Sequence, residues 1–190
     1  MNTAVVTFPG SNCDRDVQVA LGQSLRRQPN MVWHGEAEIP ETDLIVVPGG
    51  FSYGDYLRTG AIARFSPVMA AVEQFAQRGG LVIGICNGFQ VLCEAGLLPG
   101  VLMRNEHLQF RCQWASLLVE SGDSPFTSAC ESGQVLSIPI SHGEGAYYAD
   151  APTLQAMEQS GQVLFRYCEP SGEVTAEANP NGSVGNIAGI

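Results

Sequence analysis

A single cysteine stands where the pattern of the chain changes abruptly. Residues 84–88 read Gly-Ile-Cys-Asn-Gly, the form G-x-C-x-G, between the apolar run LVIGI and the helical pattern NGFQVLCEAG. This form is the cysteine counterpart of the nucleophile elbow, a strained strand-to-helix turn that exposes the attacking atom above a sheet. Its glycines let neighbouring backbone pass close. The pattern predicts that Cys86 is a nucleophile, and the alternative is that it fills a small buried gap.

The helix expected after Cys86 would supply the electrostatics that a nucleophile needs. Partial positive charge at a helix N-terminus favours the thiolate, which is the reactive form of cysteine. The main-chain amide of Asn87 would point toward an acyl oxyanion. A second glycine-rich turn, PGGFSYGD at 48–55, also follows a predicted strand and could bring amides to the same edge of the sheet. It matches neither the phosphate loop G-x-x-x-x-G-K-[ST] nor the dinucleotide motif G-x-G-x-x-G.

A cysteine nucleophile of this kind needs a base, and the base needs an orienting group. The chain has three histidines. His34 ends a predicted strand and is interpreted as structural, whereas His107 lies in a polar connection and is expected to face solvent. His142 stands two residues before Glu144, so both side chains would leave one face of an extended segment. From the residues alone, His142 is the candidate base and Glu144 its orienting carboxylate.

Strands that alternate with helices must position these groups. Four strands are expected before Pro99, at 3–8, 31–34, 44–48 and 81–85. The helices expected between them cover 14–28, 66–79 with Ser66 as N-cap and Pro67 at N1, and 87–96. This alternation predicts a parallel sheet covered on both faces. After Pro99, strands at 110–120 and 134–142 follow each other without a long helix, which indicates antiparallel pairing at a mixed edge. The last expected elements are a helix at 151–161 and strands at 162–168 and 186–190.

Composition limits the class of protein. A chain of 190 residues with 45% hydrophobic residues suits a single domain, 1–190, with a substantial core. The net charge of -10 argues against a nucleic-acid partner. Six cysteines without a C-x-x-C pair give no zinc-site spacing. No signal peptide or membrane-length apolar run is visible, so we expect a cytoplasmic protein with reduced thiols and no metal.

Five longer motifs carry a resemblance to a known family. They are FPGSNCD, PGGFSYGDYLRTGAIARF, GICNGFQVLCEAGLLPG, PISHGEGAYY and NPNGSVGNIAGI. Together, over nearly the whole chain, they resemble the glutaminase subunits of phosphoribosylformylglycinamidine synthase, an enzyme of purine biosynthesis. This family belongs to the class I, triad-type glutamine amidotransferases. The resemblance implies an α/β, doubly wound, flavodoxin-like fold with a mixed, mostly parallel sheet and helices on both faces.

The resemblance also implies a reaction and partners. Cys86 would attack the side-chain amide of glutamine, release ammonia, and form a γ-glutamyl thioester that water hydrolyses to glutamate. The ammonia would pass to the formylglycinamide ribonucleotide synthetase large subunit, which uses ATP and magnesium. A small third subunit often completes the complex, and no cofactor is expected in the glutaminase subunit itself.

Roles for further residues follow only from the resemblance. Gly50 and Asn87 would donate main-chain N–H groups to the oxyanion, and Gln90 would lie near the amino-acid end of the substrate. The segment that binds glutamine, largely through its backbone, would contain Ser141, Gly143 and Glu144. FSYGDYLR at 51–58 is expected to face the synthetase. The plain alternatives are that Gly50 only makes a turn, that Gln90 is only solvated, and that SHGEG is only a loop.

One departure from the family concerns the base. The resemblance assigns the base and its carboxylate to a His-Pro-Glu near the C-terminus, and the 190 residues contain no such tripeptide. We therefore expect a domain that lacks its C-terminal end, or a glutaminase fold without two triad members, and low turnover by these residues. The alternative function is a non-catalytic module that only binds the synthetase. A related cysteine hydrolase or stress protein would need a glutamate in FPGSNCDRD, which offers only Asp14 and Asp16.

Overall fold

The computed structural model describes residues 1–190. Its contacts group into two compact units, residues 1–98 and residues 99–190, and each is described by itself. That the whole chain forms one domain stays a prediction. No helix is long and apolar enough to cross a membrane.

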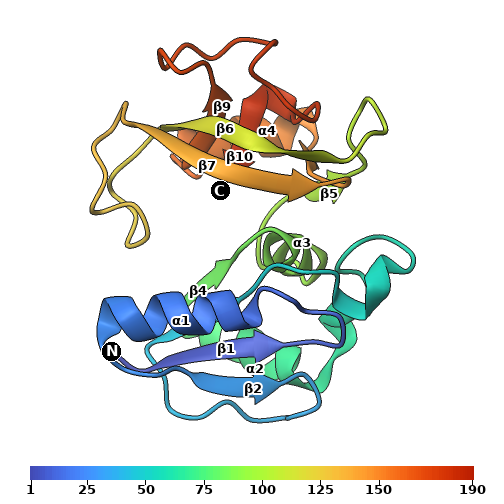
Figure 1. Ribbon diagram of the computed structural model, residues 1–190, viewed down its shortest axis with the longest axis vertical. Helices are drawn as coiled ribbons and strands as arrows, with labels where there is room; N and C mark the ends of the chain where they lie inside the picture. Colours follow the sequence, from blue (N-terminus) through green and yellow to red (C-terminus); the bar gives the residue numbers. More distant parts are fainter. The chain divides into compact units, whose positions relative to one another are not determined.

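The first unit contains a four-stranded parallel sheet in the order β2-β1-β3-β4 (Figure 1). Its strands are β1 Thr3–Thr7, β2 Asn30–Trp33, β3 Leu44–Val47 and β4 Leu81–Gly84. Its helices are α1 Asp14–Leu25, α2 Pro67–Gln77 and α3 Asn87–Glu94, with the short helices η1 Ser52–Asp55 and η2 Ala63–Phe65. Every element predicted in this part of the chain is present, and the flavodoxin-like order is confirmed.

Helices lie on both faces of this sheet because the two crossovers run in opposite directions. The connection from β1 to β2 moves toward one edge and that from β3 to β4 toward the other, and both are right-handed by preference. Figure 1 shows α1 in front of the sheet. Residues of α2 and α3 pack on the other face in one apolar cluster, which contains Ala4, Val6, Phe8, Val32, Ile45, Val47, Ala63, Val68, Met69, Val72, Val91 and Leu92. Both faces are therefore buried, as a parallel sheet requires.

The second unit is built on antiparallel pairing. Its main sheet has the order β10-β9-β6-β7, and a smaller sheet pairs β5 with β8. The strands are β5 Val101–Met103, β6 Arg111–Val119, β7 Val135–His142, β8 Ala146–Tyr148, β9 Phe165–Cys168 and β10 Ile187–Gly189, with α4 Ala151–Gln159 and η3 Val184–Asn186. The predicted antiparallel pairing is confirmed, but these strands form sheets of their own rather than an edge of the first sheet. Strands β5 and β8 were not predicted, because three residues are too short to show a period.

The start of α2 differs in detail from the expectation. Ser66 occupies the N-cap position and Pro67 the first helical position, yet the Ser66 hydroxyl makes no bond to the helix. It lies 2.7 Å from the hydroxyl of Tyr53, and that hydroxyl is 2.8 Å from Nδ1 of His34. The serine therefore ties the segment that follows β3 to the helix rather than capping it.

Candidate active site

Cys86 occupies a strained turn between β4 and α3. Its dihedral angles are φ 53° and ψ -109°, which a residue with a side chain adopts only at a cost of about 1–3 kcal/mol. Main-chain atoms lie so close to both flanking positions that only glycine fits there. A Cβ on Gly84 would lie 2.5 Å from the carbonyl oxygen of Gly88. A Cβ on Gly88 would lie 1.9 Å from the carbonyl oxygen of Val47. The predicted nucleophile elbow is present, with the geometry that such a turn needs.

Cys86 is an exposed residue, but protein atoms surround much of its thiol. The main-chain N–H of Asn87 donates to its sulfur, which lowers the thiol pKa. Burial among surrounding protein atoms has the larger effect and raises the pKa of Cys86, and the nearby Cys13 and Asp55 raise it further. The predicted effect of the helix terminus is therefore present, but the other causes outweigh it. Attack by the thiol therefore requires a base that removes its proton.

The loop after β3 is joined to the loop after β1. Gly50 has φ +140°, a conformation that side chains rarely adopt, and a Cβ there would lie 2.7 Å from the main-chain nitrogen of Asn12. Ser11 and Gly50 form an isolated antiparallel bridge, and the N–H of Phe51 donates to Gly10 at 3.0 Å. The two loops follow the neighbouring parallel strands β1 and β3, whose connections run toward opposite edges of the sheet. Doubly wound sheets bind ligands at this position.

Buried amides connect this loop to the elbow. The N–H of Ser52 donates to Oδ1 of Asn87 at 3.2 Å, and Nδ2 of Asn87 donates to Oε1 of Gln90 at 3.0 Å. Both Asn87 and Gln90 are buried. The alternative that Gln90 is merely solvated is therefore wrong. Its role beside the substrate stays a prediction, as does the oxyanion role of Gly50.

A second cysteine that sequence reasoning missed lies beside the elbow. A Cβ placed on Gly49 would be 3.4 Å from Sγ of Cys13 and 3.4 Å from Cβ of Cys86. Burial, followed by the charges of Asp16 and Asp14, raises the pKa of the Cys13 thiol. No signal in the sequence points to this proximity, because it depends on β1 and β3 being neighbours in the sheet.

The segment predicted to bind glutamine lies in the second unit. β7 ends at His142, β8 begins at Ala146, and the residues between them form the GEG turn, 143–145. Glu144 lies 3.5 Å from Arg104. Nδ1 of His142 faces Oδ1 of Asn105 at 3.2 Å.

The hypothesis that His142 is a base oriented by Glu144 is therefore wrong. It assumed an extended segment, and the chain turns at this point. Ser141, which precedes His142, is exposed and pairs with Cys112 in the ladder of β6 and β7. The glutamine-binding roles of Ser141, Gly143 and Glu144 stay predictions.

The other two histidines have structural partners. His34 is half-buried with Nδ1 on the Tyr53 hydroxyl, which agrees with its interpretation as structural. His107 accepts the N–H of Gln109 on Nδ1 at 3.1 Å, and its Nε2 lies 2.8 Å from the carbonyl oxygen of Pro180. The expectation that His107 faces solvent is therefore wrong. No group of three or more His, Cys, Asp or Glu is arranged to hold a metal ion.

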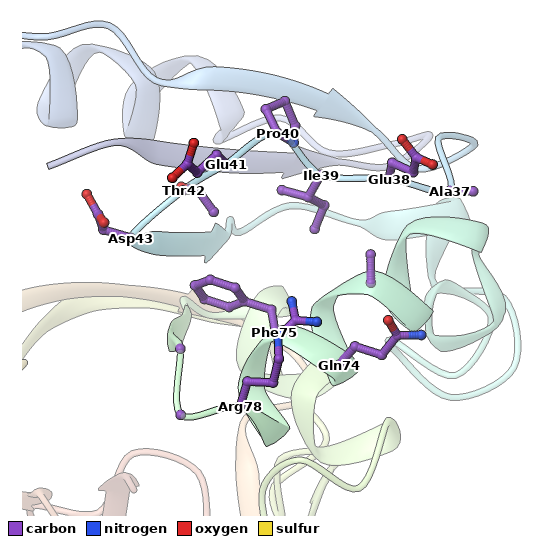
Figure 2. A pocket seen from close by; sticks show the side chains of 13 residues that line it. Ala37, Glu38, Ile39, Pro40, Glu41, Thr42, Asp43, Gln74, Phe75 and Arg78 are labelled. Carbon is purple, nitrogen blue, oxygen red and sulfur yellow. The ribbon is translucent and has the colours of Figure 1, made fainter.

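A cavity of about 620 Å³ in the first unit lies away from the elbow (Figure 2). Residues 37–43 line one side, and Gln74, Phe75 and Arg78 line the other. Asp43 and Gly80, which directly precede β3 and β4, belong to its wall, so the cavity opens at the N-terminal ends of these strands. Cys86 follows the C-terminal end of β4, and no predicted site residue lines this cavity.

Comparison with known proteins gives one family. Residues 1–190 match the CobB/CobQ-like glutamine amidotransferase domain. Phosphoribosylformylglycinamidine synthase subunit PurQ of Moorella thermoacetica is 62% identical over 190 residues, which are 100% of this chain and 80% of that relative. The corresponding subunit of Salinibacter ruber is 59% identical over 98% of this chain and 79% of its own length.

Solved structures agree with this family. A chain in the structure of PurLQS from Thermotoga maritima superimposes with a TM-score of 0.82 and 41% identity, over 98% of this chain and 79% of that one. The glutaminase domain of Trypanosoma brucei CTPS with bound acivicin has a TM-score of 0.56 at 14% identity, over 91% of this chain and 77% of that one, and supports the fold alone. The α/β fold predicted from the sequence is confirmed. The chain belongs to the CobB/CobQ-like glutamine amidotransferases and, among them, to the PurQ glutaminase subunits of phosphoribosylformylglycinamidine synthase.

Proposed function

We propose that Cys86 is the nucleophile through which this chain hydrolyses glutamine to glutamate and ammonia. The observation that carries this assignment is the elbow itself, with a strained, exposed thiol whose sulfur accepts the N–H of Asn87. A buried structural cysteine would need neither the strain nor the amide. The same arrangement suits acyl transfer, because a donor beside the sulfur stabilises the negative oxygen that forms when the carbonyl is attacked.

The proposed reaction proceeds in balanced steps. The thiol loses its proton to a base, and the sulfur bonds to the side-chain carbonyl carbon of glutamine. The N–H groups of Asn87 and Gly50 hold the oxyanion, which collapses as ammonia leaves with the transferred proton. Water then cleaves the thioester and releases glutamate. In the family that the sequence resembles, the base is the histidine of a His-Pro-Glu tripeptide, which the 190 residues do not include.

We assign Gln90 to the amino-acid end of the substrate, since it lies one helical turn after Cys86 and its amide is held by Asn87. Ser141, Gly143 and Glu144 would hold glutamine mainly through the backbone of the GEG turn and of Ser141, two residues before it. The side chain of Glu144 pairs with Arg104, which leaves the main chain of this segment for recognition.

The ammonia would be consumed by a partner, as in the complexes that the relatives' names describe. We propose a synthetase large subunit that uses ATP and magnesium to form the amidine, together with a small third subunit, all in the cytoplasm. The docking surface would include Tyr56, Leu57 and Phe65, apolar residues that are 75%, 85% and 74% exposed. Arg58 follows Leu57 and pairs with both carboxylate oxygens of Glu94 at 2.5 and 2.8 Å. This ion pair would hold the segment that carries Tyr56 and Leu57 in place.

Replacing Leu57 with aspartate is expected to weaken binding of the synthetase by about tenfold or more, because an apolar anchor becomes a charge at the centre of the contact. Leu108→Asp is the matched control. Leu57 and Leu108 are both exposed and both left-handed, with φ 69° and φ 57°, and aspartate tolerates that conformation. Titration by isothermal calorimetry measures both variants. Equal affinities for the two variants would remove Leu57 from the docking surface.

Labelling with 6-diazo-5-oxonorleucine, an electrophile shaped like glutamine, tests the proposed nucleophile. Peptide mass spectrometry is expected to find the label on Cys86 and not on Cys112, which is also exposed but has no such turn. Excess glutamine should slow the labelling because the two molecules compete for one site. Labelling that is uniform over the cysteines, or absent in the assembled complex, would instead favour a module that only binds the synthetase.

A further inference from the structure

The GEG turn is held by two fully buried asparagines from distant loops. Nδ2 of Asn105 donates to the carbonyl oxygen of His142 at 3.0 Å, and Oδ1 of Asn105 accepts the N–H of Gly145 at 3.0 Å. Nδ2 of Asn181 donates to the carbonyl oxygen of Gly145 at 2.9 Å. Both asparagine side chains have no exposed surface, so these bonds are protected from competition with water.

These backbone partners dictate the protonation of His142. Because Oδ1 of Asn105 accepts from Gly145, the atom 3.2 Å from Nδ1 of His142 is an oxygen, and Nδ1 must carry the hydrogen. Oδ1 of Asn181 accepts the N–H of Ser183 at 3.0 Å, so Asn181 turns its amino group toward Nε2 of His142, at a long 3.5 Å. The amino group that faces Nε2 favours a lone pair on this nitrogen over a proton. The network fits one form of the ring, the neutral Nδ1–H tautomer.

The surroundings oppose a positive charge on the ring. Burial has the largest effect and lowers the pKa of His142; a hydrogen bond to its own backbone raises it, and the neighbouring His107 lowers it again. Arg111 lies opposite His142 in the ladder of β6 and β7, and Glu144 follows in the turn but is engaged by Arg104. From β9, the hydroxyl of Tyr167 reaches the amide of Asn181 at 3.4 Å.

Close packing transmits the state of the ring to the turn. A Cβ on Gly145 would lie 2.5 Å from Nδ1 of His142, so the ring lies directly against the backbone of the turn. A proton on Nε2 would point at the amino group of Asn181, which also holds the carbonyl oxygen of Gly145. In protonated His142, the Nε2–H and the amino group of Asn181 would both be donors and would repel each other. This repulsion would loosen the turn.

We propose that neutral His142 is a positioning residue for glutamine: it fixes the GEG turn, and its protonation or removal weakens substrate binding without changing the reactivity of Cys86. This proposal rests on the proposed role of Ser141, Gly143 and Glu144 in holding glutamine. It gives His142 a part in the reaction other than that of the base for which its sequence position first suggested it. It also explains why a histidine is useful here, since Nδ1 donates while Nε2 accepts.

Steady-state glutaminase kinetics of the assembled synthase test the proposal. His142→Ala is expected to raise KM for glutamine by about tenfold while kcat changes less than about threefold, the split that marks loss of binding rather than of chemistry. His142→Asn should recover most of the wild-type KM, because its amide nitrogen takes the place of Nδ1–H and donates to Asn105. An unchanged KM in His142→Ala would overturn the proposal, and so would a loss confined to kcat.

The pH profile supplies a readout that a merely structural role would not move. As the pH falls below the ordinary histidine pKa of ~6.5, the ratio of wild-type KM to that of His142→Asn should rise. The folded protein lowers the pKa of His142, so the neutral ring persists until the pH falls below the ordinary value. A flat ratio, while imidazole ¹⁵N shifts show His142 titrating, would overturn the proposal. This comparison also serves if the alanine variant fails to fold.

His107→Gln is the matched control. A glutamine side chain can still donate to the carbonyl oxygen of Pro180, and His107 is not one of the two asparagines that hold the GEG turn. It should leave KM at about pH 8 within about twofold of the wild type. Wild-type labelling of Cys86 by the glutamine analogue separates the two proposals. If labelling fails, the proposed function fails, whereas intact labelling with an unchanged KM in His142→Ala overturns only the positioning role.

Discussion

In an assembly that supplies the base, the Cys86→Ala variant is expected to lose glutamine-dependent amidine synthesis by a factor of about 10⁴ or more, as nucleophile removal does in comparable hydrolases. Synthesis supplied with free ammonia should stay within about twofold of the wild type, because the variant removes the source of ammonia and not its use. The expected contrast follows from the exposed thiol at the elbow, with no second elbow in the chain to replace it. Coupled assays with glutamine or ammonium as the nitrogen donor measure the two activities on one preparation.

Two further substitutions make this result specific. Cys112→Ser removes another exposed thiol and should leave both activities unchanged. Cys13→Ser removes the thiol beside the elbow and tests whether that neighbour can substitute for the nucleophile. Glutamine-dependent synthesis that survives in Cys86→Ala but vanishes in Cys13→Ser would transfer the nucleophilic role from Cys86 to Cys13.

The elbow could be predicted because the residues that mark it are adjacent in the sequence. Two glycines, a thiol and a strand-to-helix change fall within five residues, and the clashes that require Gly84 and Gly88 follow from that turn packed on the neighbouring strand β3. The strands themselves were predictable from β-branched runs, and α2 from its Pro67 start and its end near Gly79. Close agreement between sequence and structure is expected where a feature depends on adjacent residues.

Features that depend on distant residues could not be predicted. The pairing of His142 with Asn105 spans 37 positions, and its approach to Asn181 spans 39. A single sequence gives no sign that two asparagines in polar loops are fully buried. The proximity of Cys13 to Cys86 likewise requires the strand order, which periodicity does not give.

The pKa of the Cys86 thiol depends on more than the sequence motif. The helix terminus does act on Cys86 through the N–H of Asn87, as predicted, but the loss of hydration is the larger effect. A helix end contributes roughly 0.3–1 kcal/mol, whereas desolvation can shift a buried group by several pKa units. Ionisation of the thiol therefore depends on the base.

Replacing Gly88 with alanine is expected to destabilise the protein and to slow labelling of Cys86 by the glutamine analogue at least tenfold. Intrinsic propensity alone would predict the opposite, because alanine favours a helix over glycine by about 1 kcal/mol. The new Cβ would lie 1.9 Å from the carbonyl oxygen of Val47, so α3 must move away from β3 and carry the N–H of Asn87 with it. Overpacking of this kind costs about 1–3 kcal/mol or more, which exceeds the gain in propensity.

Gly96→Ala, at the other end of the same helix, separates this clash from the general cost of altering a glycine. Gly96 has φ +71° and no atom within 4 Å of an added Cβ, so only left-handed strain of about 1–2 kcal/mol is expected there. Urea unfolding should place the midpoint of Gly88→Ala below that of Gly96→Ala, and only Gly88→Ala should lose labelling at Cys86. If Gly88→Ala unfolds at the wild-type midpoint and labels at the wild-type rate, α3 does not need its close approach to β3, and the elbow does not depend on the backbone contact that its second glycine permits.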